Sequence, residues 1–374
     1  MLVVMSLDAT QEQIEAVAEQ ARRLGYSPHV IPGATRTAIG ITGNRGPDGQ
    51  DSLRMMPGVV DVIRVTVPYR LVSREMHPQP TIVPVANTRI GDGFTVIAGP
   101  CSVENEDMLM RTAEFLVGQG VRLMRGGAYK PRSSPYSFQG LGREGLRLLA
   151  KARAETGIAI VTEVLDIENV DYIEETADVL QIGTRNMQNT ALLRRVAKSN
   201  KPVLLKRGMA ATHEEWLMAA EYVVSGGNPN VILCERGVRS SDQARTTLDL
   251  TAVPVMKSLS HLPIIIDPSH GTGKADYVPA MSRAALAAGA DGLLVEVHPD
   301  PGRALSDGSQ SLTFEAFAAM YASLKPLAAA LNETLAPAQA VRSSGWAVTA
   351  GIVSTVKVAA SLVAVPQLLV KTAR

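Results

Sequence analysis

Four residues combine a thiol, an imidazole and two carboxyl groups: Cys101, His270, Glu296 and Asp307. Such a mixed set of sulfur, nitrogen and oxygen ligands suits a divalent transition metal, and one soft ligand with three harder ones favours Mn, Fe, Co or Zn over Mg. No local ligand spacing such as Cys-x-x-Cys supports the set. A lone cysteine is usually a small buried apolar residue, and an Asp-Gly pair is usually a turn. The residues alone leave both readings open.

A second group is cationic, and its members stand at or just after the ends of apolar runs: Arg125, Lys130, Arg132, Arg185, Lys206 and Arg236. Converging cations repel one another unless a polyanion lies among them. Phosphate-bearing substrates suit that field, because Arg offers a bidentate fork and Lys a point charge. Any one of these cations is also consistent with a solvated surface residue, whereas six at equivalent positions favour an anion site.

Both groups lie in a region where strand-like and helix-like segments alternate. The strand-like runs cover residues 95–98, 121–125, 159–162, 179–182, 203–206, 230–233, 263–267 and 292–296. Helix-like segments follow them, for example at 190–199 and 212–225. This alternation predicts an α/β fold, a (β/α)8 TIM barrel over residues 94–335, in which reactive residues project from the carboxyl ends of the strands. The competing doubly wound sheet normally stops at five or six strands.

Residues 1–70 predict a separate small domain. Thr10 and Gln13 form a capping-box pattern ahead of a helix. Strand-like runs at 1–5, 28–31, 37–41 and 59–65, with a short helix at 51–56, complete the β-α-β-β-α-β order of a ferredoxin-like α+β domain. It contains no catalytic constellation. Prolines at 68, 78, 80 and 84 predict an extended linker over residues 71–93.

Residues 336–374 form an apolar C-terminal extension. The stretch 346–370 carries a single charge, Lys357, and is long enough to span a bilayer. A central lysine costs about 2.5–3.5 kcal/mol on insertion scales, however, which favours packing against the barrel or across a subunit interface. Membrane attachment is therefore the less favoured interpretation.

Composition narrows the class of protein. The 374 residues carry 37 Lys plus Arg against 36 Asp plus Glu, a net charge of +1, which argues against nucleic acid as the main partner. Two cysteines exclude a secreted disulfide framework, and Cys234 is expected in the core. No secretory signal pattern is visible, so a cytoplasmic protein is expected. The Gly-Thr-Gly-Lys run at 271–274 does not meet the P-loop pattern.

Five motifs carry a family resemblance: Gly-Pro-Cys-Ser at 99–102, Lys-Pro-Arg-Ser-Ser-Pro at 130–135, Gln-Ile-Gly-Thr-Arg-Asn at 181–186, Asp-Pro-Ser-His at 267–270 and Glu-Val-His-Pro at 296–299. Together they resemble 3-deoxy-D-arabino-heptulosonate 7-phosphate (DAHP) synthase, the first enzyme of the shikimate pathway, in its short microbial class with an N-terminal regulatory domain. The resemblance covers residues 1 to about 335. It has no counterpart for the apolar extension.

The resemblance implies roles for individual residues. The metal would be held by Cys101, His270, Glu296 and Asp307. Phosphoenolpyruvate would be held by Arg125, Lys130, Glu163, Arg185, Lys206 and Arg236. Erythrose 4-phosphate would meet Arg132 and Ser133. Lys130 is expected to be catalytic as the proton donor, with a metal-bound water as the alternative, beside the catalytic ligands Cys101 and His270. The family commonly has Thr in place of Ser133, and Ser133 keeps the hydroxyl. It commonly has Ala in place of Thr184, so Thr184 adds a hydroxyl near the phosphate.

The family also implies partners and rivals. A homotetramer or homodimer is expected, with tyrosine or phenylalanine as the effector of the N-terminal domain. A related family, 3-deoxy-D-manno-octulosonate 8-phosphate synthase, has a loop resembling Lys-Ala-Asn-Arg-Ser-Ser, so the Pro131-Arg132 pair favours the four-carbon acceptor. Two further hypotheses are a phosphosugar-binding barrel without catalysis, which should have lost metal positions, and a membrane-tethered interaction protein.

Overall fold

The computed structural model describes residues 1–33, 36–43, 49–240, 245–331 and 334–335. They belong to one unit, Met1–Gln339. The predicted packing or membrane insertion of the apolar extension concerns residues 336–374, which lie outside the described residues. Among those described, no helix has both the length and the apolar character needed to cross a membrane.

Eight parallel strands close into a barrel, which confirms the predicted fold class over the doubly wound sheet. The strands are β7 (Thr95–Gly99), β8 (Leu123–Arg125), β9 (Ala159–Val164), β10 (Val179–Ile182), β11 (Val203–Lys206), β12 (Val231–Glu235), β13 (Ile264–Ile266) and β14 (Gly292–Glu296). Pairing of β14 with β7, from Gly292 opposite Thr95 to Glu296 opposite Gly99, closes the circle. All carboxyl ends therefore meet at one rim, as a barrel active site requires.

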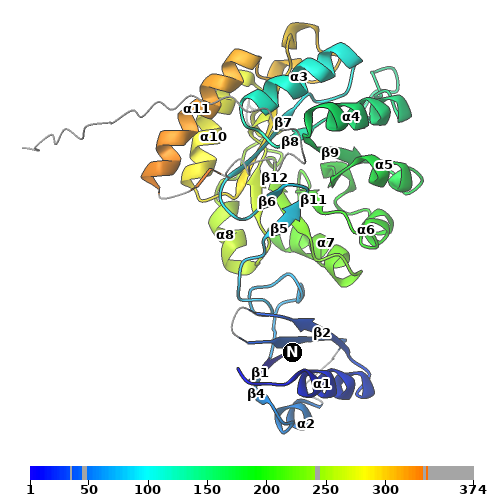
Figure 1. Cartoon of the computed structure of the whole chain (residues 1–374), viewed down its shortest axis with the longest axis vertical. Helices are drawn as coiled ribbons and strands as arrows, with labels where there is room; N and C mark the ends of the chain where they lie inside the picture. The colour runs from blue at the N-terminus through cyan, green and yellow to red at the C-terminus, as the bar shows by residue number, and fades with distance from the viewer. Residues whose placement is uncertain (34–35, 44–48, 241–244, 332–333, 336–374) are drawn as a thin grey trace, which may run out of the picture. The chain divides into compact units, whose positions relative to one another are not determined.

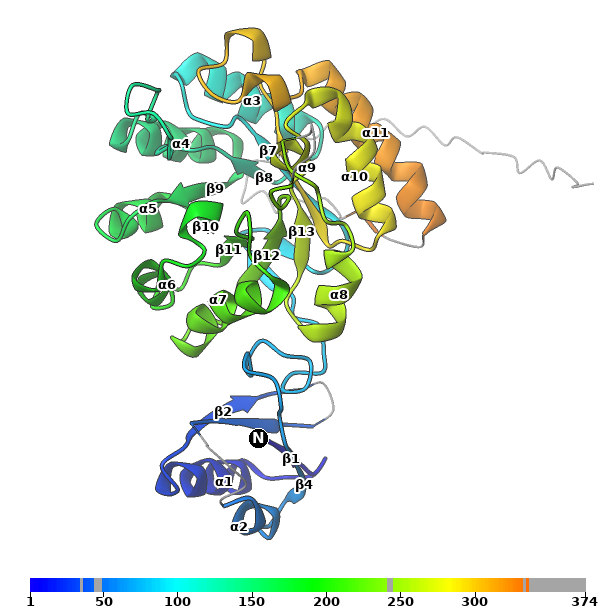
Figure 2. The ribbon, with the colours of Figure 1, turned by 180° about the vertical axis from the view of Figure 1, so that it is seen from behind.

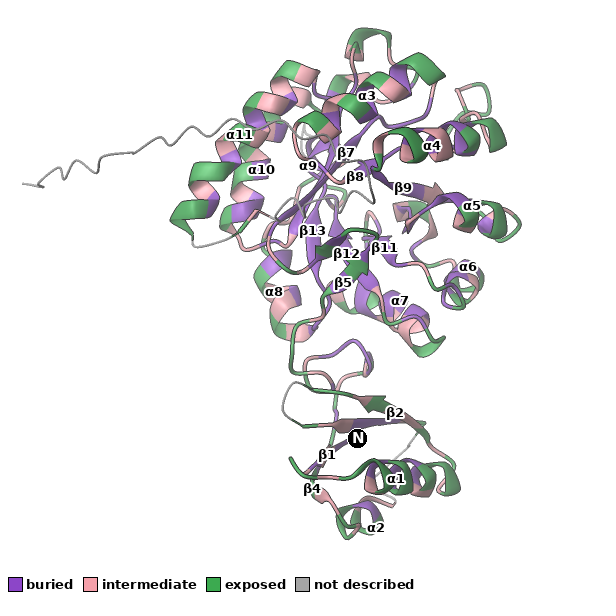
Figure 3. Ribbon diagram, in the orientation of Figure 1, coloured by how far each residue is buried: buried purple, intermediate pink, exposed green. Residues whose placement is uncertain are grey.

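Helices surround the barrel on its outside (Figures 1 and 2). They are α3 (Glu106–Gly118), α4 (Arg143–Thr156), α5 (Val170–Thr176), α6 (Thr190–Val196), α7 (His213–Ser225), α8 (Ala252–Leu259), α10 (Val278–Ala287) and α11 (Phe314–Ala330), and the short α9 (Pro268–Thr272) follows β13. Figure 3 shows buried strands and helices that expose one face. Helix α7 begins with a Thr212–Glu215 capping box and buries Trp216 completely, with its indole N–H donated to the Leu205 carbonyl at 3.1 Å.

The N-terminal residues form the predicted ferredoxin-like domain. Its antiparallel sheet has the order β2-β3-β1-β4. The elements are β1 (Leu2–Met5), α1 (Gln11–Arg23), β2 (Ser27–Ile31), β3 (Ala38–Thr42), α2 (Gln50–Arg54) and β4 (Val59–Ile63). The predicted capping box of α1 is present: the Thr10 hydroxyl accepts from the Gln13 N–H, and the Gln13 side chain accepts from the Thr10 N–H. Val3 and Ile39 of the sheet share an apolar core with Val17 of α1.

The linker differs from the extended chain that its prolines predicted. It contains a hairpin of β5 (Val83–Val85) and β6 (Thr88–Ile90). Val83, Val85 and Ile90 are buried in one apolar cluster with side chains of the barrel strands, such as Leu204. The Thr81 N–H, just before the hairpin, donates to the His261 carbonyl ahead of β13. Burial of three apolar side chains therefore gives this segment a fixed place at the amino ends of the strands.

Residues 71 and 72 of the linker are fastened to the barrel by hydrogen bonds. The backbone N–H groups of Leu71 and Val72 each donate to the Glu221 carboxylate of α7 at 3.0 Å. The Ser260 hydroxyl donates to the Val72 carbonyl at 2.6 Å, and His261 Nε2 lies 2.9 Å from the Leu71 carbonyl. These contacts satisfy backbone groups that would otherwise be buried without partners.

Candidate active site

A cavity of about 300 Å³ opens at the carboxyl ends of the strands. Its lining includes every residue predicted to bind substrate: Arg125, Lys130, Arg132, Ser133, Glu163, Thr184, Arg185, Lys206 and Arg236. His270 and Asp307 of the predicted metal group line it as well. The whole cationic group and two of the four predicted metal ligands therefore line one pocket.

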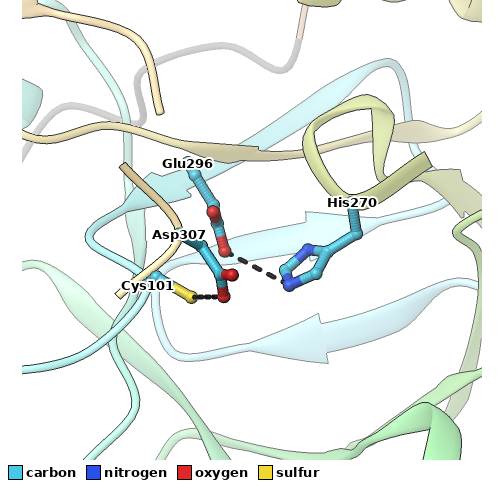
Figure 4. A group of neighbouring side chains, drawn as sticks. All are labelled: Cys101, His270, Glu296 and Asp307. Atoms are coloured by element: carbon cyan, nitrogen blue, oxygen red, sulfur yellow. Dashed lines mark hydrogen bonds and ion pairs between the residues drawn. The ribbon is translucent and has the colours of Figure 1, made fainter. Parts of the chain in front are cut away.

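The four predicted metal ligands converge beside this cavity (Figure 4). Each offers one ligand atom, and these atoms all lie within 4.8 Å of one another. Cys101 Sγ is 3.0 Å from Asp307 Oδ2, and His270 Nε2 is 3.3 Å from Glu296 Oε1. Asp307 has a left-handed backbone, with φ of 50°, at the start of the 3-10 turn η4 (Gly308–Gln310). Four donors this close, of these types, fit a transition metal.

The surroundings of His270 also fit a ligand role. Asp267 Oδ2 lies 2.7 Å from His270 Nδ1, so Nδ1 carries the hydrogen and the lone pair of Nε2 faces the cluster. Burial lowers the pKa of His270 to about 4, which keeps the imidazole neutral, as coordination requires. On the opposite side, Gln310 Nε2 donates to Glu296 Oε2 at 2.8 Å and orients that carboxylate.

Positive charge also borders the cluster. Lys130 Nζ lies 2.5 Å from Cys101 Sγ and 3.0 Å from Asp307 Oδ2. Arg125 pairs with Glu296 Oε1 at 2.5 Å. Burial raises the pKa of the Cys101 thiol to about 12, and the charge of Glu296 adds to this effect. Because Lys130 and Arg125 act in the opposite direction and do not prevail, a divalent cation is the further charge that would favour the thiolate.

The loop that carries Asp307 is fastened to the segment that carries Cys101. The Ser102 and Ser306 hydroxyls lie 2.6 Å apart and are both buried. The Leu305 N–H donates to Glu104 Oε1 at 2.8 Å. Two neighbours of the predicted ligands thus hold the loops together, and the strained backbone of Asp307 is maintained by its surroundings.

Three cations stand at the ends of adjacent strands β10, β11 and β12. Arg185 donates to the Pro131 carbonyl at 3.0 Å and to Ser133 Oγ at 3.3 Å, which joins two loops of the rim. Lys206 Nζ lies 2.5 Å from Asp267 Oδ2. Arg236 is 3% exposed, and its guanidinium donates to the Gly237 carbonyl at 3.3 Å. Burial lowers the pKa of Arg236, so a bound anion would be strongly favoured there.

Glu163 lies among these cations because Gly183 leaves room for it. A Cβ on Gly183 would sit 1.9 Å from Glu163 Oε1, so no other residue fits without displacing the carboxylate. Burial raises the pKa of Glu163, against the opposing charges of Lys130 and Lys206.

Three residues of the site were not predicted. Asp267 supports both Lys206 and His270, and its signal was present, because it precedes His270 by the three residues typical of a helix N-cap. Gln310 and Arg245 carried no such signal, since Gln310 ends the short 3-10 turn η4 and Arg245 lies in the loop between β12 and α8. Arg245 lines the cavity, and its Nη1 donates to Gln310 Oε1 at 2.5 Å. The expectation that Cys234 belongs to the core is confirmed.

Comparisons with known proteins agree with the fold and show the family. The DAHP synthetase I family model matches residues 77–333, and the DAHP synthase ferredoxin-like domain matches residues 1–67. The phospho-2-dehydro-3-deoxyheptonate aldolase of Thermotoga maritima is 50% identical over 334 residues, which cover 89% of this chain and 99% of the relative. A crystal structure of the Thermotoga maritima enzyme aligns with a TM-score of 0.71 at 48% identity, covering 89% of this chain and 98% of the other.

A second group of relatives is more distant. The 2-dehydro-3-deoxyphosphooctonate aldolase of a Geobacter species is 34% identical over 271 residues, which cover 67% of this chain and 98% of the relative. That alignment leaves a third of the chain unmatched, whereas the family models account for both the N-terminal domain and the barrel. The chain therefore belongs to the DAHP synthetase I family and carries the ferredoxin-like domain of DAHP synthases ahead of its barrel.

Proposed function

We propose that the barrel condenses phosphoenolpyruvate with D-erythrose 4-phosphate and water, releasing phosphate and forming DAHP at the entry to aromatic amino acid synthesis. One observation carries the proposal: the six predicted cations line one cavity together with His270 and Asp307 of the four-ligand cluster. The 50% identity to a heptulosonate enzyme, against 34% to an octulosonate enzyme, supports this acceptor over the five-carbon one. All four metal positions are retained, which disfavours a barrel that only binds phosphosugars.

The cations at the ends of β10, β11 and β12 are suited to the donor. Arg185, Lys206 and Arg236 neutralise the phosphate and carboxylate of phosphoenolpyruvate, and the Thr184 hydroxyl lies at the same wall. Arg125, Lys130 and Glu163 complete this side of the cavity. When the donor is held rigidly, its binding energy offsets much of the entropy cost of bringing two substrates together.

The loop after β8 is suited to the acceptor. Arg132 and Ser133 line the cavity and bind the phosphate of erythrose 4-phosphate. The bond from Arg185 to Ser133 Oγ, at 3.3 Å, links this loop to the donor side. Both substrates are thereby kept in contact distance within one pocket.

The ligand cluster and Lys130 serve the carbonyl chemistry. Cys101, His270, Glu296 and Asp307 would hold a divalent Mn, Fe, Co or Zn ion, which would supply Lewis-acid polarisation of the acceptor aldehyde. Lys130 Nζ lies 3.0 Å from Asp307 Oδ2, at the edge of the cluster, and delivers a proton to the oxygen that becomes an alkoxide. Burial acts to lower the pKa of Lys130, but the neighbouring negative groups outweigh burial, and the net pKa is raised above its ordinary value. Nζ therefore holds its proton until that oxygen becomes basic.

The remaining assignments follow the family. The ferredoxin-like domain senses tyrosine or phenylalanine, the enzyme assembles as a homotetramer or homodimer, and it works in the cytoplasm. The absence of a catalytic cluster from the described part of residues 1–70 supports a regulatory rather than a chemical role for that domain.

The acceptor decides the function most sharply. We expect phosphate release from phosphoenolpyruvate to be far faster with erythrose 4-phosphate than with arabinose 5-phosphate. The variant Arg132→Ala should raise KM for the aldose phosphate and leave KM for phosphoenolpyruvate unchanged, with the exposed Arg111→Ala on α3 as a matched control. A preference for the pentose phosphate contradicts the assignment. Binding of phosphoenolpyruvate without turnover would instead support a non-catalytic barrel.

A further inference from the structure

The Gly-Thr-Gly-Lys run that fails the P-loop pattern has a different place in the fold. It forms the end of α9, and its glycines support the loop between β12 and α8. A Cβ on Gly273, where φ is +71°, would lie 2.9 Å from Arg245 Cβ and 3.0 Å from Arg245 Cδ. The Thr246 hydroxyl donates to the Gly271 carbonyl at 2.6 Å and is buried. The run therefore forms the surface on which the aliphatic part of the Arg245 side chain packs.

The guanidinium of Arg245 extends from this surface to the cavity. It lines the pocket together with Arg236 and His270, and its side chain is 44% exposed. Its Nη1 donates to the neutral Gln310 amide at 2.5 Å and stands 3.9 Å from Asp307 Oδ1, a loose ion pair. The guanidinium of Arg245 is thus partly exposed and has further N–H donors available for a ligand.

Arg245 also stands close enough to Arg236 to repel it. Burial lowers the pKa of Arg236, and the charge of Arg245 lowers it further. Arg236 is 3% exposed, and its guanidinium donates to a neutral carbonyl, that of Gly237. Two neighbouring guanidinium groups repel each other. A doubly charged anion between them would attract both and outweigh this repulsion.

We propose that Arg245 is a further binding residue for the phosphate of the enol donor, where it acts together with Arg236. The inference rests on the proposed function and adds a contact that the strand-end cations do not supply. Gln310 holds the guanidinium beside the site until the phosphate monoester enters, and the head then turns toward the phosphate oxygens. The acceptor phosphate is the less suitable partner, because Arg132 and Ser133 belong to the loop after β8, whereas Arg245 is on the Arg236 side.

Direct binding to the metal-loaded, full-length enzyme tests this inference without turnover. Calorimetry measures Kd for phosphoenolpyruvate, for inorganic phosphate and for pyruvate, which lacks the phosphate. Loss of a charged hydrogen bond predicts that Arg245→Gln raises Kd for the first two ligands about tenfold or more. Kd for pyruvate should stay within about twofold, because its carboxylate is held elsewhere. Arg245→Lys keeps the charge without the fork and should fall between.

Two glycine substitutions separate the loss of Arg245 packing from the backbone strain of a residue with positive φ. Gly273→Ala places a methyl group against the Arg245 stem and should raise Kd for phosphate in the same direction. Gly289→Ala introduces a side chain at a comparable φ of +84°, where nothing lies within 4 Å, and should leave Kd unchanged. If Gly273→Ala fails to fold, Arg245→Lys and Arg245→Gln still decide the question.

Each outcome bears on one proposal. An unchanged Kd for phosphate in Arg245→Gln overturns the inference, as does an effect confined to KM for erythrose 4-phosphate. Failure of the wild-type enzyme to bind phosphoenolpyruvate, with inorganic phosphate still bound through Arg245, overturns the proposed function and leaves the phosphate site standing.

Discussion

Asp267 supports the site without touching the proposed metal or substrates, so removing its charge tests how Lys206 and His270 are held. Its Oδ2 accepts from Lys206 Nζ at 2.5 Å and from His270 Nδ1 at 2.7 Å, and its Oδ1 caps the His270 backbone N–H at 2.9 Å. The variant Asp267→Asn keeps the shape and the cap. It removes the negative charge that fixes the imidazole tautomer and neutralises the lysine.

Two effects should follow, and their sizes can be separated. Loss of a carboxylate behind a ligating histidine typically weakens metal affinity about 10–100-fold, or about 1.4–2.7 kcal/mol. Lys206 is 4% exposed and would be left without its carboxylate, which costs about 3–5 kcal/mol of folding stability. We therefore expect a folded but less stable protein whose metal affinity falls although all four ligands remain.

Metal competition against a chromophoric chelator measures the first effect, and urea unfolding of the same samples measures the second. Asp291→Asn is the matched control: Asp291 pairs with Lys257 at 2.9 Å and accepts from the Ile264 N–H, at the amino end of the barrel. It should lose stability without losing metal affinity. Equal metal affinity in Asp267→Asn and wild type would refute the reasoning.

Four other changes test separate parts of the structure. Glu221→Gln leaves one of the two linker N–H groups without a carboxylate oxygen and should lower the unfolding free energy by about 1–3 kcal/mol, measured in urea. An unchanged urea midpoint would mean that the hydrogen bonds from Leu71 and Val72 to Glu221 do not contribute to stability. Burial lowers the pKa of His261 to about 4, whereas the pKa of an unfolded histidine is about 6.5. Between these two pH values the imidazole is protonated in the unfolded chain and neutral in the folded one, so the stability of the fold falls as pH falls. The pH slope of stability in this window should shrink by about one proton in His261→Gln, and an identical slope contradicts the assignment. A double-mutant cycle with Ser102→Ala and Ser306→Ala should show a coupling of about 1 kcal/mol, whereas additivity would show that the two hydroxyls act independently. Deleting residues 1–70 should abolish inhibition by tyrosine or phenylalanine and preserve turnover; loss of turnover as well would make the domain structural.

The barrel could be predicted because its strands are buried on both faces and read as apolar runs. The hairpin in the linker could not. Its strands have three residues each, too few to show a period of two, and Pro84 stands inside the first. Proline is tolerated there because the hairpin has only two strands, so that an unpaired edge is always available. Burial of Val83 against the barrel, a long-range effect, decides the structure of this segment.

The ligand cluster and the strand-end cations were predictable for a related reason. Once parallel strands close into a barrel, all their carboxyl ends share a rim, so chain order alone brings Cys101 and Glu296 together. Loop residues follow no such rule. Arg245 lies ten residues beyond the end of β12, and its side chain packs on Gly273, which stands at the end of α9.

One measurement tests the proposed function most directly: formation of DAHP from phosphoenolpyruvate and erythrose 4-phosphate by one preparation, before chelation, after chelation and after addition of Mn, Fe, Co or Zn. We predict that chelation abolishes the reaction, that a divalent transition metal restores it, and that Cys101→Ser requires far more metal for the same recovery. Full activity of the thoroughly chelated wild-type enzyme would contradict the account, because Cys101 would then be a core residue and Lys130 with the arginines would have to polarise the aldehyde.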